Sequence, residues 1–385
     1  DALLDQSDAQ IVMVCDVDTF HYRDKPWGKG KAYGCEPAKT YIEKHDPSTR
    51  GLRVTKDYRE VCAADDIDAV VIATPDHWHA IGTLDAIRNG KDVYCEKPVT
   101  HTFAEGQLVY RTVEKQNTVF QTGSQQRSSN EFRRAVELIR NGHIGQLQQI
   151  EVGLPPGYDK PQADATVQQP PEHLDYEMWC GPAPKLPYMP ARHHRWWRGH
   201  RAFGGGVLMD WIGHHNDIAH WAMDCDASGP TEIEAVGWTF PEAAIYNTPH
   251  QYAIRCKYSN GVESVISSRY RNGVMFRGED GGIFVTRGKL EAADPKWVET
   301  DYDPGDQQVY RSDDHMRNFL NCVRTRQACI SPAETTHRSI TPGHLAYVSQ
   351  AVGRRLKWDP ASEKIINDAE AMKLLSRNEY RDPWG

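Results

Sequence analysis

The sequence predicts an α/β protein, in which a domain with a parallel sheet is followed by an α+β domain with a large, mainly antiparallel sheet. Short apolar runs alternate with helical stretches of about 10 to 15 residues up to Gly123, a pattern typical of βαβ units. Beyond that point the sequence contains turn signals typical of β-hairpins. The chain has 385 residues, a length that favours two domains.

The parallel strands are predicted in the first third of the chain. Ile11 to Cys15 and Ile67 to Ala73 are short continuous apolar runs, as expected of strands buried on both faces. Two more strands are predicted at Asp92 to Cys95 and Thr118 to Thr122. The predicted helices are Asp1 to Gln10 (as the tail of a helix), Tyr58 to Ala64, His79 to Asn89 with a stop at Gly90, and Thr102 to Gln116.

The remainder predicts an antiparallel sheet with helices. Tyr252 to Tyr258 and Val262 to Ser268 flank Asn260-Gly261, a strong hairpin signal. Leu147 to Leu154 and Phe276 to Leu290 also have strand character, and 155–190 is expected to be a long ordered loop. Helices are predicted at Asn130 to Asn141, Val207 to Met223, Asp313 to Thr325 and Thr341 to Val352. The predicted domains are 1–122 and 123–345, with a C-terminal extension at 346–385.

Composition excludes several classes of protein. Lys plus Arg number 45 and Asp plus Glu number 53, a net charge of −8 that argues against a general nucleic-acid binder. Charged residues interrupt every apolar stretch before about 18 residues, so no transmembrane helix is expected. The 9 cysteines form no Cys-x-x-Cys pair and suggest no disulfide framework.

Ligands of parallel α/β sheets bind at the carboxyl ends of the strands, so the residues there are candidates for a cofactor site. Asp16 follows the first strand and could bind the ribose of a dinucleotide, or serve only as a turn residue. Thr74, Pro75 and His77 follow the second strand. Glu96 and Lys97 follow the third, where a lysine can hold a substrate hydroxyl, although an ordinary surface pair is the plainer interpretation.

The predicted helix at 207–223 carries a candidate acid–base pair. Asp210 and His214 are spaced i, i+4 and share one face. A carboxylate beside an imidazole suits proton transfer, and three glycines at 204–206 would let the backbone approach a ligand. A polar helix with capping and packing roles is the alternative.

A metal site is an alternative interpretation, because histidines are frequent before and within the predicted helix at 207–223. No His-Glu-x-x-His pattern is present, and adjacent histidines on a helix point in different directions, so no metal is expected. The histidines considered are His193, His194, His200, His214, His215 and His220. Arg192, Trp196, Trp197 and Arg198 precede the glycines, and such residues suit either sugar binding or packing.

Together these motifs resemble the Gfo/Idh/MocA oxidoreductase family, over the whole chain. Glu96-Lys97-Pro98 and the glycine-preceded helix with Asp210, His214 and Asp217 carry the resemblance. Ala73-Thr74-Pro75 and the 123–127 segment also fit. The segments 174–184 and 357–384 are similar to a branch common among secreted bacterial members.

The resemblance implies a Rossmann domain, a second domain with an open sheet used for forming a dimer or tetramer, and NAD, with NADP less expected. Lys97 would hold the substrate hydroxyl and His214 would exchange its proton, with Asp210 binding substrate or tuning His214. The residues beside the cofactor would be Asp16, Thr74, Pro75, His77, Glu96, Lys97 and Gln125. The substrate would be a sugar, cyclitol or glycoside, with Arg192, Trp196, Trp197, Arg198, Asp210 and His214 as pocket residues.

One departure from the family concerns the N-terminal side of the sheet. Members begin with a strand and a Gly-x-Gly-x-x-Gly turn that holds the pyrophosphate. Gly28 to Gly34 has similar spacing but follows no strand, so we reject it. The parallel sheet is therefore expected to be incomplete. Two explanations stay open: the chain is a fragment, or the protein binds dinucleotide poorly or not at all.

Three functions stay open at this stage. The first is an NAD-dependent sugar or cyclitol dehydrogenase. The second is a glycosidase or lyase that oxidises C3 transiently with bound NAD, and the third is a non-catalytic binding relative. The sequence leaves the compartment open between the cytoplasm and a secreted or periplasmic location. No membrane or nucleic-acid partner is expected.

Overall fold

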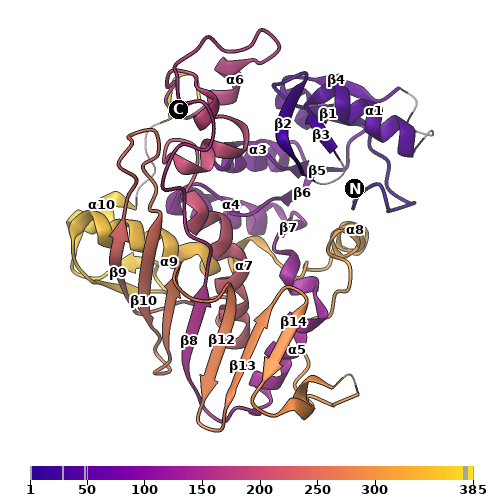
Figure 1. Cartoon of the computed structure of the whole chain (residues 1–385). Coiled ribbons are helices and arrows are strands. Elements are labelled where there is room, and N and C mark those ends of the chain that lie inside the picture. The colour runs from indigo at the N-terminus through magenta and orange to yellow at the C-terminus, as the bar shows by residue number, and fades with distance from the viewer. Residues whose placement is uncertain are drawn as a thin grey trace.

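The computed structural model describes residues 2–27, 30–46, 49, 51–299, 301–375 and 380–384. Figure 1 shows a smaller N-terminal α/β part above a large sheet that is covered by long helices. One continuous hydrophobic core runs through both parts, from Ile72 and Val93 to Ile150 and Ile254. The predicted fold class is confirmed, and the two parts share one packed interior.

The N-terminal part is built on parallel strands, as predicted. β5 (Ala69–Ile72), β6 (Asp92–Cys95) and β7 (Phe120–Thr122) form one parallel sheet, flanked by α3 (Asp76–Arg88) and α4 (Phe103–Gln116). β1 (Met13–Cys15) and β4 (Arg53–Thr55) form a separate parallel pair beside α2 (Tyr58–Ala63). Within the described residues no backbone pairing joins β1 to β5, so the parallel strands lie in two sheets.

Four elements near the N-terminus were not predicted, and β4 is one of them. β2 (His21–Trp27) and β3 (Gly30–Tyr33) form an antiparallel hairpin, and α1 (Cys35–His45) follows it. The helix escaped prediction because Pro37 breaks the helical pattern, yet proline is tolerated in a first helical turn. The predicted helix at 1–10 is wrong over 2–10, where the chain forms turns; Asp1 lies outside the described residues.

The second part contains a nine-stranded mixed sheet in the order β14-β13-β12-β8-β11-β10-β9-β15-β16. Only β8 and β11 pair in parallel, and β10 and β11 form the predicted hairpin around Asn260-Gly261. The strands are β8 (Leu147–Gly153), β9 (Glu232–Thr239), β10 (Gln251–Lys257), β11 (Glu263–Ser267), β12 (Gly273–Gly278), β13 (Gly282–Thr286), β14 (Lys289–Ala292), β15 (Leu356–Asp359) and β16 (Lys364–Ile365).

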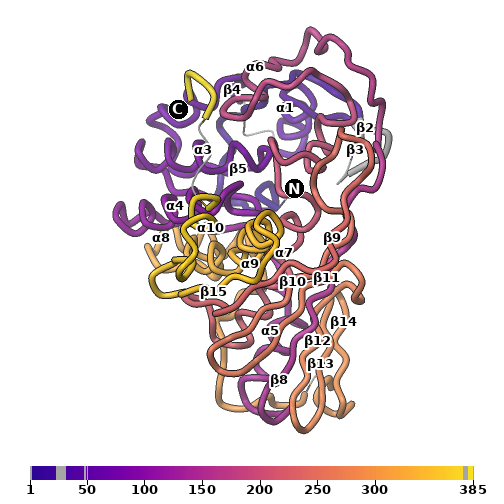
Figure 2. Tube along the Cα trace, turned by 90° about the vertical axis from the view of Figure 1, so that its left-hand side faces the viewer, coloured from indigo at the N-terminus to yellow at the C-terminus, as the bar shows by residue number. Residues whose placement is uncertain are grey.

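Helices cover one face of this sheet, as Figure 2 shows from the side. α5 (Asn130–Arg140), α7 (Gly206–Ala222) and α9 (Ala333–Val352) pack against its strands. α10 (Ala369–Leu374) contacts α9 and the edge strand β16, and α8 (His315–Thr325) contacts the turn at 125–128. α9 begins eight residues before the predicted Thr341 and passes through Pro342. Its packing against α4 and α7 offsets the hydrogen bond that the proline loses. The predicted division at 345/346 stays a prediction, and α9 spans it.

The segment 155–205 crosses from the large sheet to the N-terminal part and has a small core of its own. It contains α6 (Tyr176–Cys180) and the 3₁₀ turns η2 (Pro190–Arg192) and η3 (His194–Gly199). Aromatic side chains fill its interior, and an isolated bridge pairs Leu174 with Asp18 of the N-terminal part. The predicted loop is therefore ordered by its own packing.

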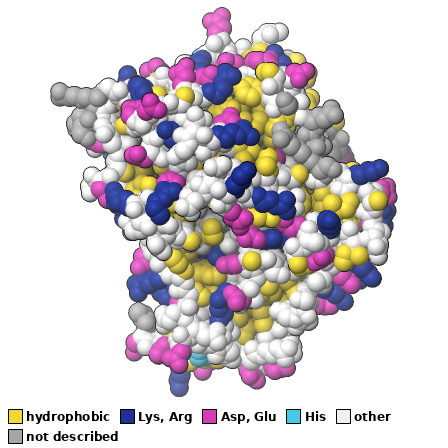
Figure 3. Space-filling view, turned by 180° about the vertical axis from the view of Figure 1, so that it is seen from behind, with side chains coloured by type: hydrophobic (Ala, Val, Ile, Leu, Met, Phe, Trp, Pro, Cys, Tyr) yellow, Lys and Arg dark blue, Asp and Glu magenta, His cyan; other side chains and the backbone are white. Residues whose placement is uncertain are grey.

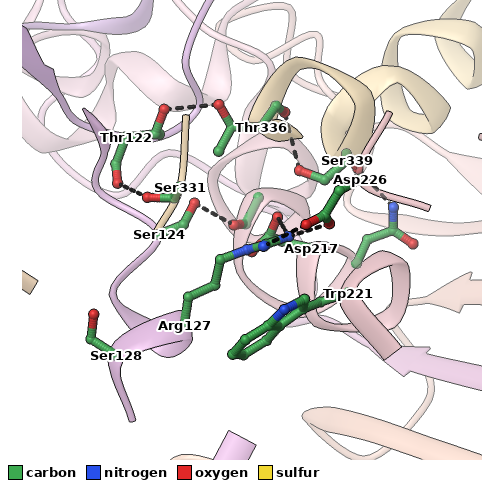
Figure 4. A network of polar contacts seen from close by, with 12 residues as sticks. Thr122, Ser124, Arg127, Ser128, Asp217, Trp221, Asp226, Ser331, Thr336 and Ser339 are labelled. Carbon is green, nitrogen blue, oxygen red and sulfur yellow. Dashed lines mark hydrogen bonds and ion pairs between the residues drawn. The ribbon is translucent and has the colours of Figure 1, made fainter. Parts of the chain in front are cut away.

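A buried ion network ties the first half of the chain to α7 (Figure 4). Arg127, in the turn η1 (Gln125–Ser128), donates to Asp217 at 2.7 Å and to Asp226 at 2.7 Å. Its guanidinium lies 5.1 Å from the centre of the Trp221 ring. Arg127 and Asp217 are almost fully buried, so each charge depends on the other for solvation.

Basic and acidic side chains are intermixed over the described residues on the face shown in Figure 3, rather than gathered into one basic patch. No helix in the described ranges is long and apolar enough to span a membrane.

Candidate active site

Lys97 and Asp210 meet where the N-terminal part faces α7. Lys97 directly follows Glu96 at the carboxyl end of β6, and Asp210 lies near the start of α7. Lys97 Nζ donates to Asp210 Oδ1 at 2.6 Å and to the Asp210 carbonyl oxygen at 2.7 Å. Arg198 Nε donates to the same carboxylate oxygen at 3.0 Å. One carboxylate is thus held between two cations from different segments.

The two cations set the charge state of Asp210. Burial alone would raise the pKa of this carboxyl group, but Arg198 and Lys97 more than offset it. The pKa of Asp210 therefore lies well below its ordinary value, and the group is ionised at neutral pH. Its anionic form keeps the Lys97 ammonium in a fixed position.

His214 lies one turn further along α7 and is 4% exposed. Burial, together with Lys97 and Arg287, lowers the pKa of His214 well below its ordinary value, so the ring is neutral at pH 7. Its Nδ1 atom is buried and has no hydrogen-bond partner among the described residues. No hydrogen bond between Asp210 and His214 is found there either, because the carboxylate is directed to Lys97 and Arg198.

The three glycines before α7 allow close packing, but the neighbours are the protein's own side chains. A Cβ on Gly204 would lie 2.7 Å from the Trp197 ring, and one on Gly206 would lie 2.7 Å from Thr248. Gly206 also has a φ of +73°, a conformation that favours glycine. The sequence interpretation that these glycines face a ligand is therefore replaced by a packing role.

Asp76 is a site residue that sequence reasoning missed. It begins α3, is 3% exposed, and accepts a hydrogen bond of 3.3 Å from the Gly205 amide. Burial raises the pKa of Asp76 to about 7, although Arg198 opposes the shift. Asp76 could have been predicted from its position in Thr74-Pro75-Asp76-His77, which follows the carboxyl end of β5.

The expected cofactor residues that follow β5, β6 and β7 lie at one sheet edge. Thr74 and Gln125 are exposed, and Pro75 and Glu96 are partly exposed. Gln125 Nε2 donates to Glu96 Oε1 at 3.1 Å, and burial raises the pKa of Glu96. One hydrogen bond therefore joins Glu96 to Gln125, and Thr74 and Pro75 follow the neighbouring strand β5.

Two other expected cofactor residues have structural contacts. The ring nitrogens of His77 lie 3.2 Å from the Phe203 carbonyl oxygen and 3.0 Å from that of Trp179. Burial lowers the pKa of His77 to about 4, so the neutral ring can donate to only one of them. Asp16 accepts a 3.0 Å hydrogen bond from the Asp18 amide, as a turn residue does. Their roles beside a cofactor stay predictions.

The residues at 192–198 that were expected to line the substrate pocket do not all lie close to Asp210. Arg198 reaches Asp210 and stacks over Trp197 at 4.2 Å, and Trp196 packs edge-on against Tyr158. Arg192 instead donates to the Pro187 carbonyl oxygen. Within the described ranges no contact joins Arg192 to Lys97, Asp210 or His214, so we place Arg192 outside the immediate site.

Family models match most of the chain. "Oxidoreductase family, NAD-binding Rossmann fold" matches residues 35–124, and "Oxidoreductase family, C-terminal alpha/beta domain" matches residues 130–385. Both describe the Gfo/Idh/MocA family. The chain belongs to this family. Its N-terminal part is therefore the Rossmann domain and its large sheet the family's C-terminal domain.

Individual relatives match over shorter stretches. An uncharacterized oxidoreductase, YrbE of Bacillus subtilis, is 25% identical over 62% of this chain and 59% of its own length. Inositol 2-dehydrogenase of Rhodococcus jostii is 33% identical over 31% of this chain and 35% of its own. A 2,7-anhydro-N-acetylneuraminate hydratase of Mediterraneibacter gnavus is 29% identical over 24% of this chain and 25% of its own. Each match spans less than two thirds of the relative.

Solved structures agree on the fold. GenD2 from gentamicin A biosynthesis, in complex with NAD, superposes with a TM-score of 0.64 at 17% identity. The superposition covers 93% of this chain and 91% of that one. At this identity the likeness establishes the architecture alone.

Proposed function

We propose that this protein is an NAD(P)-dependent oxidoreductase that transfers a hydride between the nicotinamide and a hydroxyl-bearing carbon of a sugar, cyclitol or glycoside. The observation that carries the proposal is the Lys97–Asp210 pair, with Nζ 2.6 Å from Oδ1, beside a neutral His214. When a carbinol is oxidised, its hydroxyl loses a proton and its carbon loses a hydride to the nicotinamide. A neutral imidazole can accept the proton, and a fixed cation can stabilise the alkoxide that develops.

Each group has a proposed role. Lys97 holds the substrate hydroxyl, and its charge favours the developing alkoxide. His214, kept neutral by burial, accepts the hydroxyl proton and returns it in the reverse direction. Asp210 fixes the ammonium of Lys97 and binds substrate, and Arg198 holds Asp210 from the other side. Trp196 offers an apolar face to a sugar ring, and the buried Trp197 supports Arg198, which stacks over its ring.

The residues present fit a nicotinamide cofactor. The buried Nδ1 atom of His214 lacks a partner within the described chain, and polar residues follow three parallel strands. We assign Thr74, Pro75, His77, Glu96 and Gln125 to the cofactor's border. NAD, when bound, supplies the hydride acceptor.

The adenosine end of the cofactor is assigned to Asp16, whose carboxylate binds ribose hydroxyls and disfavours a 2′-phosphate. This choice favours NAD over NADP. The family pattern has a further strand and a glycine-rich turn on the N-terminal side of β1, and we propose that tight dinucleotide binding depends on them.

A transient use of NAD is the second candidate, and the similarity to a hydratase favours keeping it. Oxidation at C3 would make the neighbouring C–H acidic, elimination would follow, and the hydride would return to C3. Lys97 and His214 would serve this chemistry equally well, so only the products distinguish the two functions.

The test is nucleotide calorimetry with NAD and NADP, followed by turnover on a panel of sugars, cyclitols and glycosides. We expect NAD to bind and NADH to accumulate with one class of substrate. Glycoside cleavage without net NADH would replace the dehydrogenase with the second candidate. Absence of binding by either nucleotide would favour a non-catalytic relative. Native mass measurement tests the proposed dimer or tetramer formed through the open face of the large sheet.

A further inference from the structure

The turn between β13 and β14 carries an arginine, Arg287, that packs against α7. β13 ends one residue before it, and β14 begins two residues after it. The turn is fixed to α5, because the Gly288 amide donates to Glu131 Oε1 at 2.8 Å. The Arg287 guanidinium lies 5.0 Å from the centre of the Trp211 ring. Trp211 follows Asp210 directly, so Arg287 packs against the part of α7 that carries the candidate site.

Gln126 joins Arg287 to His214. The Gln126 amide satisfies its neighbours when its oxygen faces Arg287 Nε, at 3.3 Å, and its nitrogen faces the His214 carbonyl oxygen, at 2.9 Å. Gln126 is buried, so this link is protected from solvent. Burial lowers the pKa of His214, and the charges of Lys97 and Arg287 lower it further. Arg287 is therefore a neighbour of the imidazole to which we assign proton transfer.

Arg287 forms no ion pair within the described parts of the chain. Asp210 is the carboxylate that favours its charged form, but the Oδ1 atom of Asp210 is already bonded to Lys97 and Arg198. Burial outweighs this distant attraction and lowers the pKa of Arg287. An anionic group on a ligand would supply the counter-charge that the described residues do not.

Arg287 is also accessible to a ligand. The residue as a whole is exposed, although its contacts with Trp211 and Gln126 remove part of its hydration. Its Nε atom is directed to Gln126, and its terminal amino groups bond to no acceptor among the described residues. Paired N–H donors of a guanidinium match the two oxygens of a carboxylate. One guanidinium also balances the single charge of a carboxylate, whereas a phosphate ester carries nearly two.

We propose that the substrate is an acidic sugar, a uronic acid or its glycoside, and that Arg287 binds its carboxylate while Lys97 holds the hydroxyl that is oxidised. Because both cations neighbour His214, the carboxylate and the reacting hydroxyl can belong to one sugar ring. The inference rests on the proposed oxidoreductase function and adds the chemical class of its substrate. The carbinol carbon gives its hydride to the nicotinamide, the hydroxyl proton passes to His214, and the carboxylate is unchanged.

The experiment measures NADH formation by the full chain with paired sugars that differ only at C6. Methyl glucuronide and methyl galacturonide carry a carboxylate there, and methyl glucoside and methyl galactoside carry a hydroxymethyl group. We expect kcat/KM to be at least about tenfold higher for the uronides, the size expected of charge-assisted hydrogen bonds. This comparison uses the unaltered chain, so it stands even where a variant fails to fold.

Arg287→Met should raise KM for the uronides by about 10- to 100-fold and leave kcat almost unchanged, because the lost contact is remote from the reacting carbon. Arg287→Lys keeps the charge without the paired donors, so its KM should lie between those of the parent chain and Arg287→Met. Lys289→Met is the matched control. It removes an exposed cation of the same turn and should leave KM for the uronides unaltered.

Failure of this inference and failure of the proposed function give different results. Equal turnover of uronides and neutral glycosides, or an unaltered KM in Arg287→Met, would overturn the acidic-sugar assignment and leave the oxidoreductase function standing. Faster turnover of glucose 6-sulfate than of the uronides would overturn the choice of a carboxylate.

If no sugar is oxidised, the proposed function fails and calorimetry with the same glycosides decides the inference. Uronide binding that is weakened in Arg287→Met but not in Lys289→Met would support the acidic-sugar assignment. Absence of any preference for the uronides in binding would overturn it.

Discussion

Lys97 Nζ lies 2.6 Å from Asp210 Oδ1 and 2.7 Å from the carbonyl oxygen of the same residue, although the two residues are 113 positions apart. The contact joins the carboxyl end of a Rossmann strand to the start of the main helix of the second domain. Because Lys97 uses both a side-chain and a backbone acceptor, its ammonium position is fixed relative to α7. His214, one turn away, is positioned by the same helix.

Lys97→Met should lower kcat by a factor on the order of 10² or more, because the fixed cation beside the reacting hydroxyl is lost. The measurement is steady-state turnover of the substrate found in the sugar panel, with circular dichroism to verify folding. Lys160→Met changes an exposed lysine and should leave kcat unaltered. Full activity in Lys97→Met would remove Lys97 from the mechanism.

His214→Asn should also lower kcat by about 10² or more, because the neutral imidazole that exchanges the proton is removed. The pH profile of kcat adds a second readout, since the limb that reports His214 should disappear. His45→Asn serves as the control, because His45 is exposed at the end of α1. An unchanged pH profile with normal turnover would show that another group transfers the proton.

Arg127→Met should destabilise the fold by about 3 to 5 kcal/mol, because it leaves Asp217 buried without its cation. Arg53→Met is the matched control. It breaks an ion pair whose side chains are 43% and 62% exposed, so we expect a much smaller change because solvent screens the pair. Urea unfolding measures both. Similar free energies of unfolding for the two variants would show that the buried network contributes little.

The alternation of strands and helices and the candidate site motifs could be predicted from the sequence. The buried strands at 69–72 and 92–95 and the hairpin at Asn260-Gly261 follow local rules of burial and turn chemistry, and they were predicted. α1 and the hairpin of β2 and β3 were not, because their stability comes from contacts with distant segments. The amide of Cys35, for example, bonds to the Asp18 carbonyl oxygen.

The candidate site was predictable as a set of residues but not as a set of partners. Spacing on one helix face suggested that Asp210 orients His214. In the fold, Asp210 is bonded to Lys97 and Arg198, which come from other segments. The contacts of Asp76 with Gly205 and of Asp18 with His194 were missed for the same reason. Their relationships arise only when segments far apart in the chain pack together.

Acidification should unfold this protein, with uptake of protons. Burial lowers the pKa to about 4 in six histidines: His77, His79, His200, His215, His220 and His315. The unfolded chain binds these protons near pH 6.5 and the folded chain only near 4. Stability is therefore present above pH 6.5 and lost as the pH falls toward 4. Each group removes roughly 2 kcal/mol at pH 5.

Asp76 acts in the opposite direction, because its pKa is raised to about 7 and its contribution falls as the pH rises from 4 to 7. Burial also raises the pKa of Asp16, Glu96 and Asp217. The six histidines outnumber these carboxyl groups, so we expect the net effect to be loss of stability in acid. The check is the free energy of unfolding in urea at pH 7.5 and pH 5. His220→Gln should reduce the difference between the two pH values, whereas His45→Gln should not. Equal stability of the parent chain at both pH values would contradict the prediction.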